Sequence, residues 1–126
     1  MTDEDAIRNT IARFCQCLDS RQFEAWSQTF TEAGVFGRLN GRAAILAMIL
    51  EGELAKQPEL KRQHAVTNSI IEIDGDTAES TSDLTMYDRV GDGPITVRTG
   101  RYYDKLSRQP NGEWLFTERR LEWRDQ

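Results

Sequence analysis

The spacing of apolar residues changes near residue 64, and this change constrains the fold more than any other feature of the sequence. Before it, apolar residues recur three and four positions apart, which is the spacing of one face of a helix. After it, apolar and polar residues alternate and β-branched side chains are frequent, which is typical of strands that are buried on one side. Helices followed by strands predict an α+β protein, in which helices cover one face of an antiparallel sheet.

Three helices are predicted in the first part of the chain. The apolar pattern predicts a first helix over residues 3–19 and a shorter second one that begins near Phe23 and continues towards Phe30. An extended piece over residues 35–39 follows. The third helix is predicted over residues 43–55, which are rich in Ala, Leu, Ile and Met and end shortly before a proline.

Four strands are predicted in the second part, over residues 64–73, 77–88, 95–106 and 113–123. The turns between them are short and contain glycine, so consecutive strands are expected to pair as an antiparallel meander. The chain has 126 residues, and domains cluster at roughly 100–150 residues, so we expect a single domain over residues 1–126.

The charge balance excludes several classes of partner. Lys and Arg number 16 against 21 Asp and Glu, which gives a formal net charge of −5. The arginines near the end alternate with acidic residues and form no basic stripe, so we expect no nucleic-acid partner. A hydrophobic content of 38% with 29% charged residues is typical of a globular protein and predicts neither a membrane span nor disorder.

The two cysteines predict free thiols. Cys15 and Cys17 lie two positions apart in the first predicted helix, where they point to different faces and are poorly placed for a disulfide. A structural zinc site uses four Cys or His ligands, and the chain has fewer, so we expect no metal. Free thiols and an acidic start that is unlike a secretory signal predict a cytoplasmic protein.

His64 is the single histidine, so any chemistry that needs an imidazole near neutral pH has one candidate. Strand alternation places His64 on one face with Val66, Asn68 and Ile70. If this face meets the helices, a base and an amide stand in an apolar concavity, which is the usual makeup of a small-molecule site. The alternative is a surface histidine at the start of a strand.

Asp19 is the second candidate. It lies at the carboxyl end of the first predicted helix, close to the apolar stripe. A carboxylate at this end meets the negative pole of the helix dipole, which favours a stabilising partner nearby. The alternative is a solvated turn residue that begins the polar stretch Asp19-Ser20-Arg21.

Arg119 is the third candidate. Alternation on the last strand predicts that it shares a face with uncharged residues, namely Leu115, Thr117, Leu121 and Trp123. It either meets an anion in a pocket or lays its stem across core aromatics. On the preceding strand Tyr102 and Tyr103 are adjacent, so one of them faces the core and the other does not.

Several short segments carry a resemblance to a known family. They are Cys17-Leu18-Asp19-Ser20-Arg21-Gln22-Phe23 with Phe30, His64-Ala65-Val66-Thr67-Asn68, Asp74-Gly75-Asp76-Thr77-Ala78, Gly100-Arg101-Tyr102 and Asn111-Gly112-Glu113-Trp114. Together they resemble the SnoaL-like branch of the nuclear transport factor 2-like superfamily, which includes scytalone dehydratase, hexachlorocyclohexane dehydrochlorinase and ketosteroid isomerase. The resemblance implies a cone-shaped α+β barrel, with three N-terminal helices packed on a strongly curved antiparallel sheet. It also implies self-association as a dimer or a trimer.

The resemblance also implies roles for residues. Dehydratase-like relatives pair a carboxylate at the end of the first helix with a histidine at the start of the long strand, and these positions match Asp19 and His64. Asp19 would orient His64, which would take a C–H proton next to a leaving group. Arg119 resembles the arginine that assists a departing anion in the dehydrochlorinase. Phe14 stands where some relatives have a Tyr or Lys, and Gly37 stands near the position of the ketosteroid isomerase base.

We therefore predict a cofactor-independent lyase or isomerase that acts on a small apolar cyclic metabolite, with Asp19 and His64 as catalytic residues. The side chains expected to contact the substrate are Phe14, Trp26, Asn68, Tyr102 and Arg119. The alternative is a non-catalytic small-ligand-binding protein, or an accessory subunit that resembles the β subunit of ring-hydroxylating dioxygenases.

Overall fold

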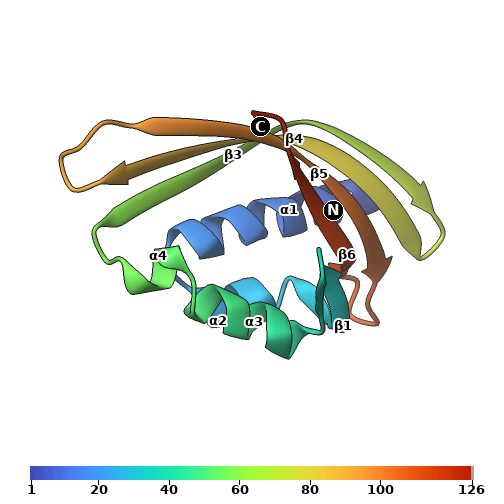
Figure 1. Ribbon diagram of the computed structural model, residues 1–126. Helices are drawn as coiled ribbons and strands as arrows, with labels where there is room; N and C mark the ends of the chain where they lie inside the picture. Colours follow the sequence, from blue (N-terminus) through green and yellow to red (C-terminus); the bar gives the residue numbers. More distant parts are fainter. Residues whose placement is uncertain (126) are drawn as a thin grey trace.

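The computed structural model describes residues 1–125, which form four helices and one six-stranded sheet (Figure 1). In chain order the elements are α1 (Asp3–Asp19), α2 (Phe23–Ser27), β1 (Phe30–Phe36), β2 (Leu39–Asn40), α3 (Arg42–Leu50), α4 (Glu53–Lys56), β3 (Leu60–Asp74), β4 (Thr77–Val90), β5 (Thr96–Arg108) and β6 (Trp114–Trp123).

The sheet has the order β2-β1-β6-β5-β4-β3 and arches over the helices (Figure 1). The four long strands form the predicted antiparallel meander, and β1 joins β6 in parallel. The sheet is curved but not closed, because β2 and β3 remain at its edges. The α+β class and the packing of helices on one face of a curved sheet are confirmed.

The first part of the chain differs from the predicted helices in two places. The stretch predicted as one helix over residues 43–55 is broken into α3 and α4 at Glu51 and Gly52, because glycine weakens a helix interior. Phe30 does not extend α2 but begins β1, where it pairs with Phe116 of β6. The extended piece becomes the β1–β2 hairpin, which adds two strands that the apolar pattern did not reveal.

A β-bulge in β3 reverses the strand alternation after Val66. Asn68 and Ser69 together oppose a single residue of β4, and Asn68 has a φ of 54°, in the left-handed region that Asn tolerates well. The Asn68 side chain is exposed and donates a hydrogen bond to Asp83 Oδ2 at 3.0 Å. The prediction that Asn68 and Ile70 share the face of His64 is therefore wrong.

A second bulge, at Thr117 of β6, separates Arg119 from Leu115 and Thr117, two of the residues predicted to share its face, but leaves it on the same face as Leu121 and Trp123. Phe116 pairs with Leu106, whereas Glu118 pairs with Lys105, so Thr117 is the extra residue. Arg119 consequently shares the inner face with Trp114 and Phe116, and its side chain is fully buried.

The core between sheet and helices is aromatic, and Phe14 of α1 lies at its centre. Its ring meets five others edge to face, with centroid distances of 5.3 to 6.1 Å, and these are Trp26, Phe30, Phe36, Tyr102 and Phe116. Such edge-to-face contacts add to the stability that burial of apolar area provides. They hold α1 and α2 against the inner face of the sheet, where the candidate site lies.

Candidate active site

Asp19 and His64 form a dyad on the inner face of the sheet. Asp19 is the last residue of α1, and its Oδ2 accepts a hydrogen bond from the backbone N–H of His64 at 2.9 Å. Its Oδ1 lies 2.5 Å from the Nδ1 of the His64 ring. Since a carboxylate is an acceptor, Nδ1 carries the proton, and Nε2 is the ring nitrogen that can accept a proton from a ligand. The imidazole is 5% exposed and the carboxylate 19% exposed.

Arg21 connects the segment that carries Asp19 to the segment that leads to His64. Its backbone has a φ of 61°, and its guanidinium donates to the carbonyl oxygens of Leu54, of Gln57 at 2.9 Å and of Leu60 at 2.5 Å. These carbonyls belong to α4, to the loop after it and to the first residue of β3. Arg21 therefore fastens the start of β3 to the turn that follows Asp19. Nothing in the local sequence pattern indicated this role.

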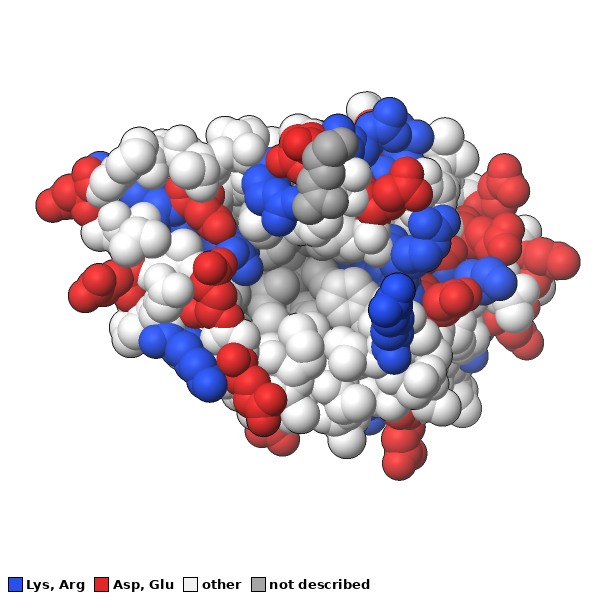
Figure 2. All heavy atoms as spheres, viewed as in Figure 1, with Lys and Arg blue, Asp and Glu red and all other residues white. Residues whose placement is uncertain are grey.

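A cavity of about 290 Å³ lies in front of the dyad, between the helices and the sheet. Its walls include Phe14, Leu18, Trp26, Leu84 and Tyr102, and His64 also lines it. Figure 2 shows this side of the molecule hollowed between sheet and helices, with charged side chains around the rim. The volume is at the low end of ligand sites, which span roughly 300–1,000 Å³, so the cavity suits a ligand of one or two rings.

Tyr102 is the tyrosine that faces the core. It is 2% exposed and lines the cavity, whereas Tyr103 lies on the outer face, where the Arg120 guanidinium is 4.3 Å from its ring centroid. Burial raises the pKa of Tyr102, so its hydroxyl remains protonated near neutral pH. Within residues 1–125 this hydroxyl makes no hydrogen bond, which leaves it able to donate to a ligand.

Arg119 lies behind the cavity wall and does not line the cavity. Its Nε donates to Asp104 Oδ1 at 2.9 Å, and its guanidinium carbon lies 3.5 Å from the Tyr102 ring centroid and 4.2 Å from that of Phe14. Ser80 donates to the other carboxylate oxygen of Asp104 at 3.1 Å. Burial raises the pKa of Asp104, and the neighbouring Arg119 opposes this rise.

The structure thus brings together most of the residues singled out from the sequence. His64, Phe14, Trp26 and Tyr102 line the cavity, and Asp19 lies directly behind His64. Asn68 and Arg119 do not line it. Further lining residues were not predicted from the sequence, among them Arg62, Arg98 and Trp123. Their inward direction depends on strand pairing, although the alternation of side chains on β5 and β6 was a usable signal for Arg98 and Trp123.

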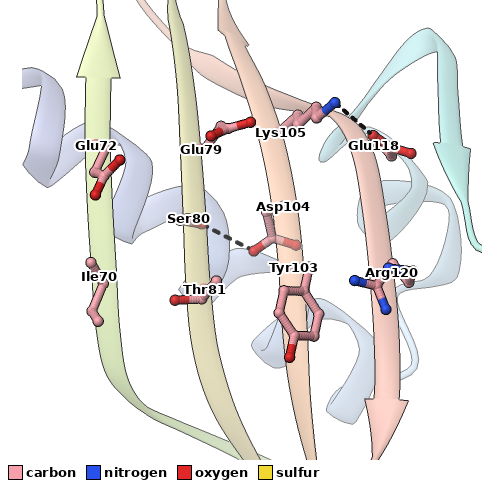
Figure 3. Close-up of a pocket in the computed structure, with 10 residues that line it drawn as sticks. All are labelled: Ile70, Glu72, Glu79, Ser80, Thr81, Tyr103, Asp104, Lys105, Glu118 and Arg120. Atoms are coloured by element: carbon pink, nitrogen blue, oxygen red, sulfur yellow. Dashed lines mark hydrogen bonds and ion pairs between the residues drawn. The ribbon is translucent and has the colours of Figure 1, made fainter.

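A second concavity lies on the outer face of the sheet (Figure 3). It measures about 440 Å³, and Ile70, Glu72, Glu79 and Tyr103 are among its lining residues. It lies on the opposite side of the sheet from the dyad, and His64 does not line it. We therefore place the candidate site in the interior cavity.

Residues 1–125 contain no group of three or more His, Cys, Asp and Glu side chains arranged to hold a metal ion. No helix formed by the same residues combines the length and apolar character required to cross a membrane.

Comparisons with known proteins agree with this fold. The SnoaL-like domain family matches residues 1–120. An NTF2-like protein with a cystatin-like fold from Novosphingobium aromaticivorans is 27% identical, with a TM-score of 0.82 over 98% of this chain and 82% of that one. A Catenulispora acidiphila protein in complex with S-DNPA is 25% identical, with a TM-score of 0.84 over 95% of this chain and 92% of that one.

A third solved structure shows the same fold at lower identity. It is a putative scytalone dehydratase from Novosphingobium aromaticivorans, 21% identical, with a TM-score of 0.84 over 96% of this chain and 83% of that one. No curated protein matches the sequence significantly. The family match and the interior cavity support a small-molecule-binding protein. Because the match covers nearly the whole chain, we conclude that this protein belongs to the SnoaL-like domain family of the nuclear transport factor 2-like superfamily.

Proposed function

We propose that this protein is a cofactor-independent lyase or isomerase that acts on a small, largely apolar cyclic metabolite. The observation that carries the proposal is the geometry of the dyad. Asp19 accepts from both the backbone and the ring of His64, and the ring lines a cavity whose walls include several aromatic and aliphatic side chains. A histidine held in one tautomer beside a cavity of this kind is suited to take a proton from a bound ligand.

In the proposed reaction, Nε2 of His64 takes a proton from a ligand carbon next to a carbon that bears a hydroxyl group. The C–H electron pair forms the new double bond, and the hydroxyl group leaves. The imidazolium returns the proton to the departing oxygen, so the products are an alkene and water, and the base is regenerated. If the proton returns to another carbon instead, the outcome is a shifted double bond.

The neighbouring groups favour both steps. The Asp19 carboxylate stabilises the imidazolium through the contact at Nδ1. Tyr102 keeps its proton, because burial raises its pKa, and can donate a hydrogen bond to a ligand carbonyl or hydroxyl oxygen. Phe14 and Trp26 supply apolar walls that keep water from the reacting carbon.

Deuterium exchange into bicyclic ketones such as 2-tetralone tests the proton transfer without knowledge of the natural substrate. Ligand binding is first measured by quenching of tryptophan fluorescence, because Trp26 and Trp123 line the cavity. We expect the protein to accelerate exchange at the carbon next to the carbonyl. His64→Gln and Asp19→Asn should each reduce this acceleration by about 10²- to 10⁴-fold while the protein stays folded.

Asp92→Asn is the matched control, because it removes an exposed carboxylate in the turn after β4 and should leave the exchange rate unchanged. A bound ketone whose exchange is equally fast in the native protein and in His64→Gln would overturn the catalytic proposal. The protein would then be a ligand carrier. Self-association as a dimer or a trimer stays a prediction.

A further inference from the structure

The charged residues around the cavity differ in how fully they are already paired. Arg62 lines the cavity, but Asp88 binds it through two hydrogen bonds of 2.8 Å, and Glu53 Oε1 lies 2.8 Å from its Nη2. The hydrogen bond with Asp88 raises the pKa of Arg62. Two carboxylates therefore neutralise this guanidinium, and it has little capacity for a ligand.

Arg98 is different. Within residues 1–125 its side chain makes no hydrogen bond and forms a single, longer ion pair, in which Oδ2 of Asp125 is 3.5 Å from its Nε. Its guanidinium carbon lies 3.8 Å from the ring centroid of Trp123, and both side chains line the cavity. The side chain is 38% exposed, which places it where the cavity meets solvent.

The stacking on Trp123 orients this guanidinium. Trp123 pairs with Gly100 across β5 and β6, and a Cβ atom at position 100 would lie 3.3 Å from the Trp123 ring and 3.0 Å from Leu121. The glycine thus lets the indole lie close to the sheet, beneath Arg98. A stacked guanidinium loses less freedom when it binds a planar anion, and its two terminal amino groups match the two oxygens of a carboxylate.

Register fixes how far this cation lies from the base. His64 pairs with Met86, and Met86 pairs with Arg98, so the three residues form one row across the inner face. Two strand spacings separate His64 from Arg98, which is about 10 Å. A ligand of two fused rings with a carboxylate at one end spans such a row.

We propose that the ligand of this cavity is a cyclic carboxylate whose carboxylate group binds Arg98 at the opening, while its rings occupy the apolar interior next to His64. The proposal rests on the interior cavity being the ligand site of the proposed function, and it names the substrate class. It does not depend on proton transfer by His64. It also explains how a chain with a net charge of −5 selects an anionic ligand.

The test compares two ligands of nearly the same shape, 2-naphthoate and 2-naphthamide, by tryptophan fluorescence quenching at pH 7.5 and low salt. We expect the native protein to bind the naphthoate at least tenfold more tightly than the uncharged amide. Arg98→Gln should remove this preference: the affinity for 2-naphthoate should fall at least tenfold, and the affinity for 2-naphthamide should change little. Arg89→Gln is the matched control, because Arg89 lies on the same hairpin but outside the cavity and donates to the Gly93 carbonyl.

Three outcomes would overturn the proposal: no binding of 2-naphthoate, equal affinity for the two ligands, or a preference for naphthoate that survives Arg98→Gln. His64→Gln separates this proposal from the proposed reaction, because that variant should keep the full preference for naphthoate. Arg98-dependent binding without any deuterium exchange would support the substrate class and contradict the chemistry. Deuterium exchange without a preference for the carboxylate would support the proposed reaction and contradict the substrate class.

Discussion

Two carboxylates on the inner side of the molecule, Asp19 and Asp104, each bind a basic side chain. The two pairs differ in whether the basic side chain can still contact a ligand. Asp19 accepts from Nδ1 of His64, and the imidazole still reaches the cavity with its other nitrogen. Asp104 accepts from Nε of Arg119, whose guanidinium is then enclosed by Tyr102, Phe14 and Phe116. Both pairs lie close together in the fold, yet one faces a ligand space and the other faces only protein.

The difference shows that a charged pair is a functional candidate only when one partner keeps an accessible acceptor or donor. Nη1 and Nη2 of Arg119 are buried and have no hydrogen-bond partner among residues 1–125, but the aromatic rings cover them. Their stabilisation comes from the ring faces and from Asp104. We therefore expect the Asp104–Arg119 pair to affect stability and the Asp19–His64 pair to affect chemistry.

The largest effect on stability is expected from Arg119→Met. This change leaves the Asp104 carboxylate buried without its cation, which should lower the free energy of unfolding by about 3–5 kcal/mol. The measurement is urea denaturation at pH 7. The double variant Asp104→Leu with Arg119→Met should regain a large part of the loss, because no unpaired charge remains. A loss below about 1 kcal/mol in Arg119→Met would contradict the buried pair.

A smaller effect is expected in the pH dependence of stability. It involves Cys15, because charged residues of both pairs affect the pKa of its thiol. Burial raises the pKa of the Cys15 thiol from 9.0 to about 11, Arg119 lowers it, and Asp19 and Asp104 raise it. The folded protein therefore holds this proton more tightly than the unfolded chain, so stability falls as the pH rises from about 9 to about 11. The decrease attributable to Cys15 is roughly 2–3 kcal/mol.

Denaturation of Cys15→Ala at several pH values measures this contribution. The decrease between pH 9 and pH 11 should be smaller in Cys15→Ala than in the native protein, although the raised pKa of Tyr102 adds a decrease of the same sign to both. Cys17→Ala, which alters the half-buried thiol nearby, should retain the full decrease. Identical pH profiles for Cys15→Ala and the native protein would contradict the burial of this thiol.

The smallest effect on stability is expected from Asp19→Asn. The carboxylate is partly exposed, and an amide oxygen can still accept one of its two hydrogen bonds, so the loss should be about 1–2 kcal/mol. The same substitution should have a clearer effect on the tautomer of His64 than on stability. Because the chain has one histidine, ¹⁵N NMR of the imidazole gives a single pair of signals, with the proton on Nδ1 in the native protein. Unchanged ¹⁵N shifts in Asp19→Asn would exclude an orienting role for Asp19.

The sequence predicted the features that depend on local periodicity. It predicted α1 with the same bounds, the four long strands within a few residues of their ends, and the position of His64 near the start of β3. Asp19 was identified by its unfavourable place at the end of a helix, and the structure supplies its partner. These features follow from the spacing of side chains along one element.

Features that depend on pairing between strands were not predicted correctly. The bulges at Asn68 and Thr117 each insert one residue, and each turns the following side chains to the other face. Asn68 therefore lies outside the predicted site, and Arg119 shares the inner face with Trp114 and Phe116 in place of Leu115 and Thr117. A bulge is set by the register of two strands, and alternation within one strand contains no information about it.

Local sequence patterns were enough to show that helices precede strands and that one histidine carries any imidazole chemistry, and they marked Asp19 as a carboxylate at the unfavourable end of a helix. The packing of helices and strands fixed which partner each carboxylate meets, which tyrosine faces the cavity, and that Arg98 lines the cavity beside Trp123. The reason is physical. Periodicity fixes directions within one element, whereas the distance between residues such as Asp19 and His64, far apart in the chain, exists only once the helices and strands have packed.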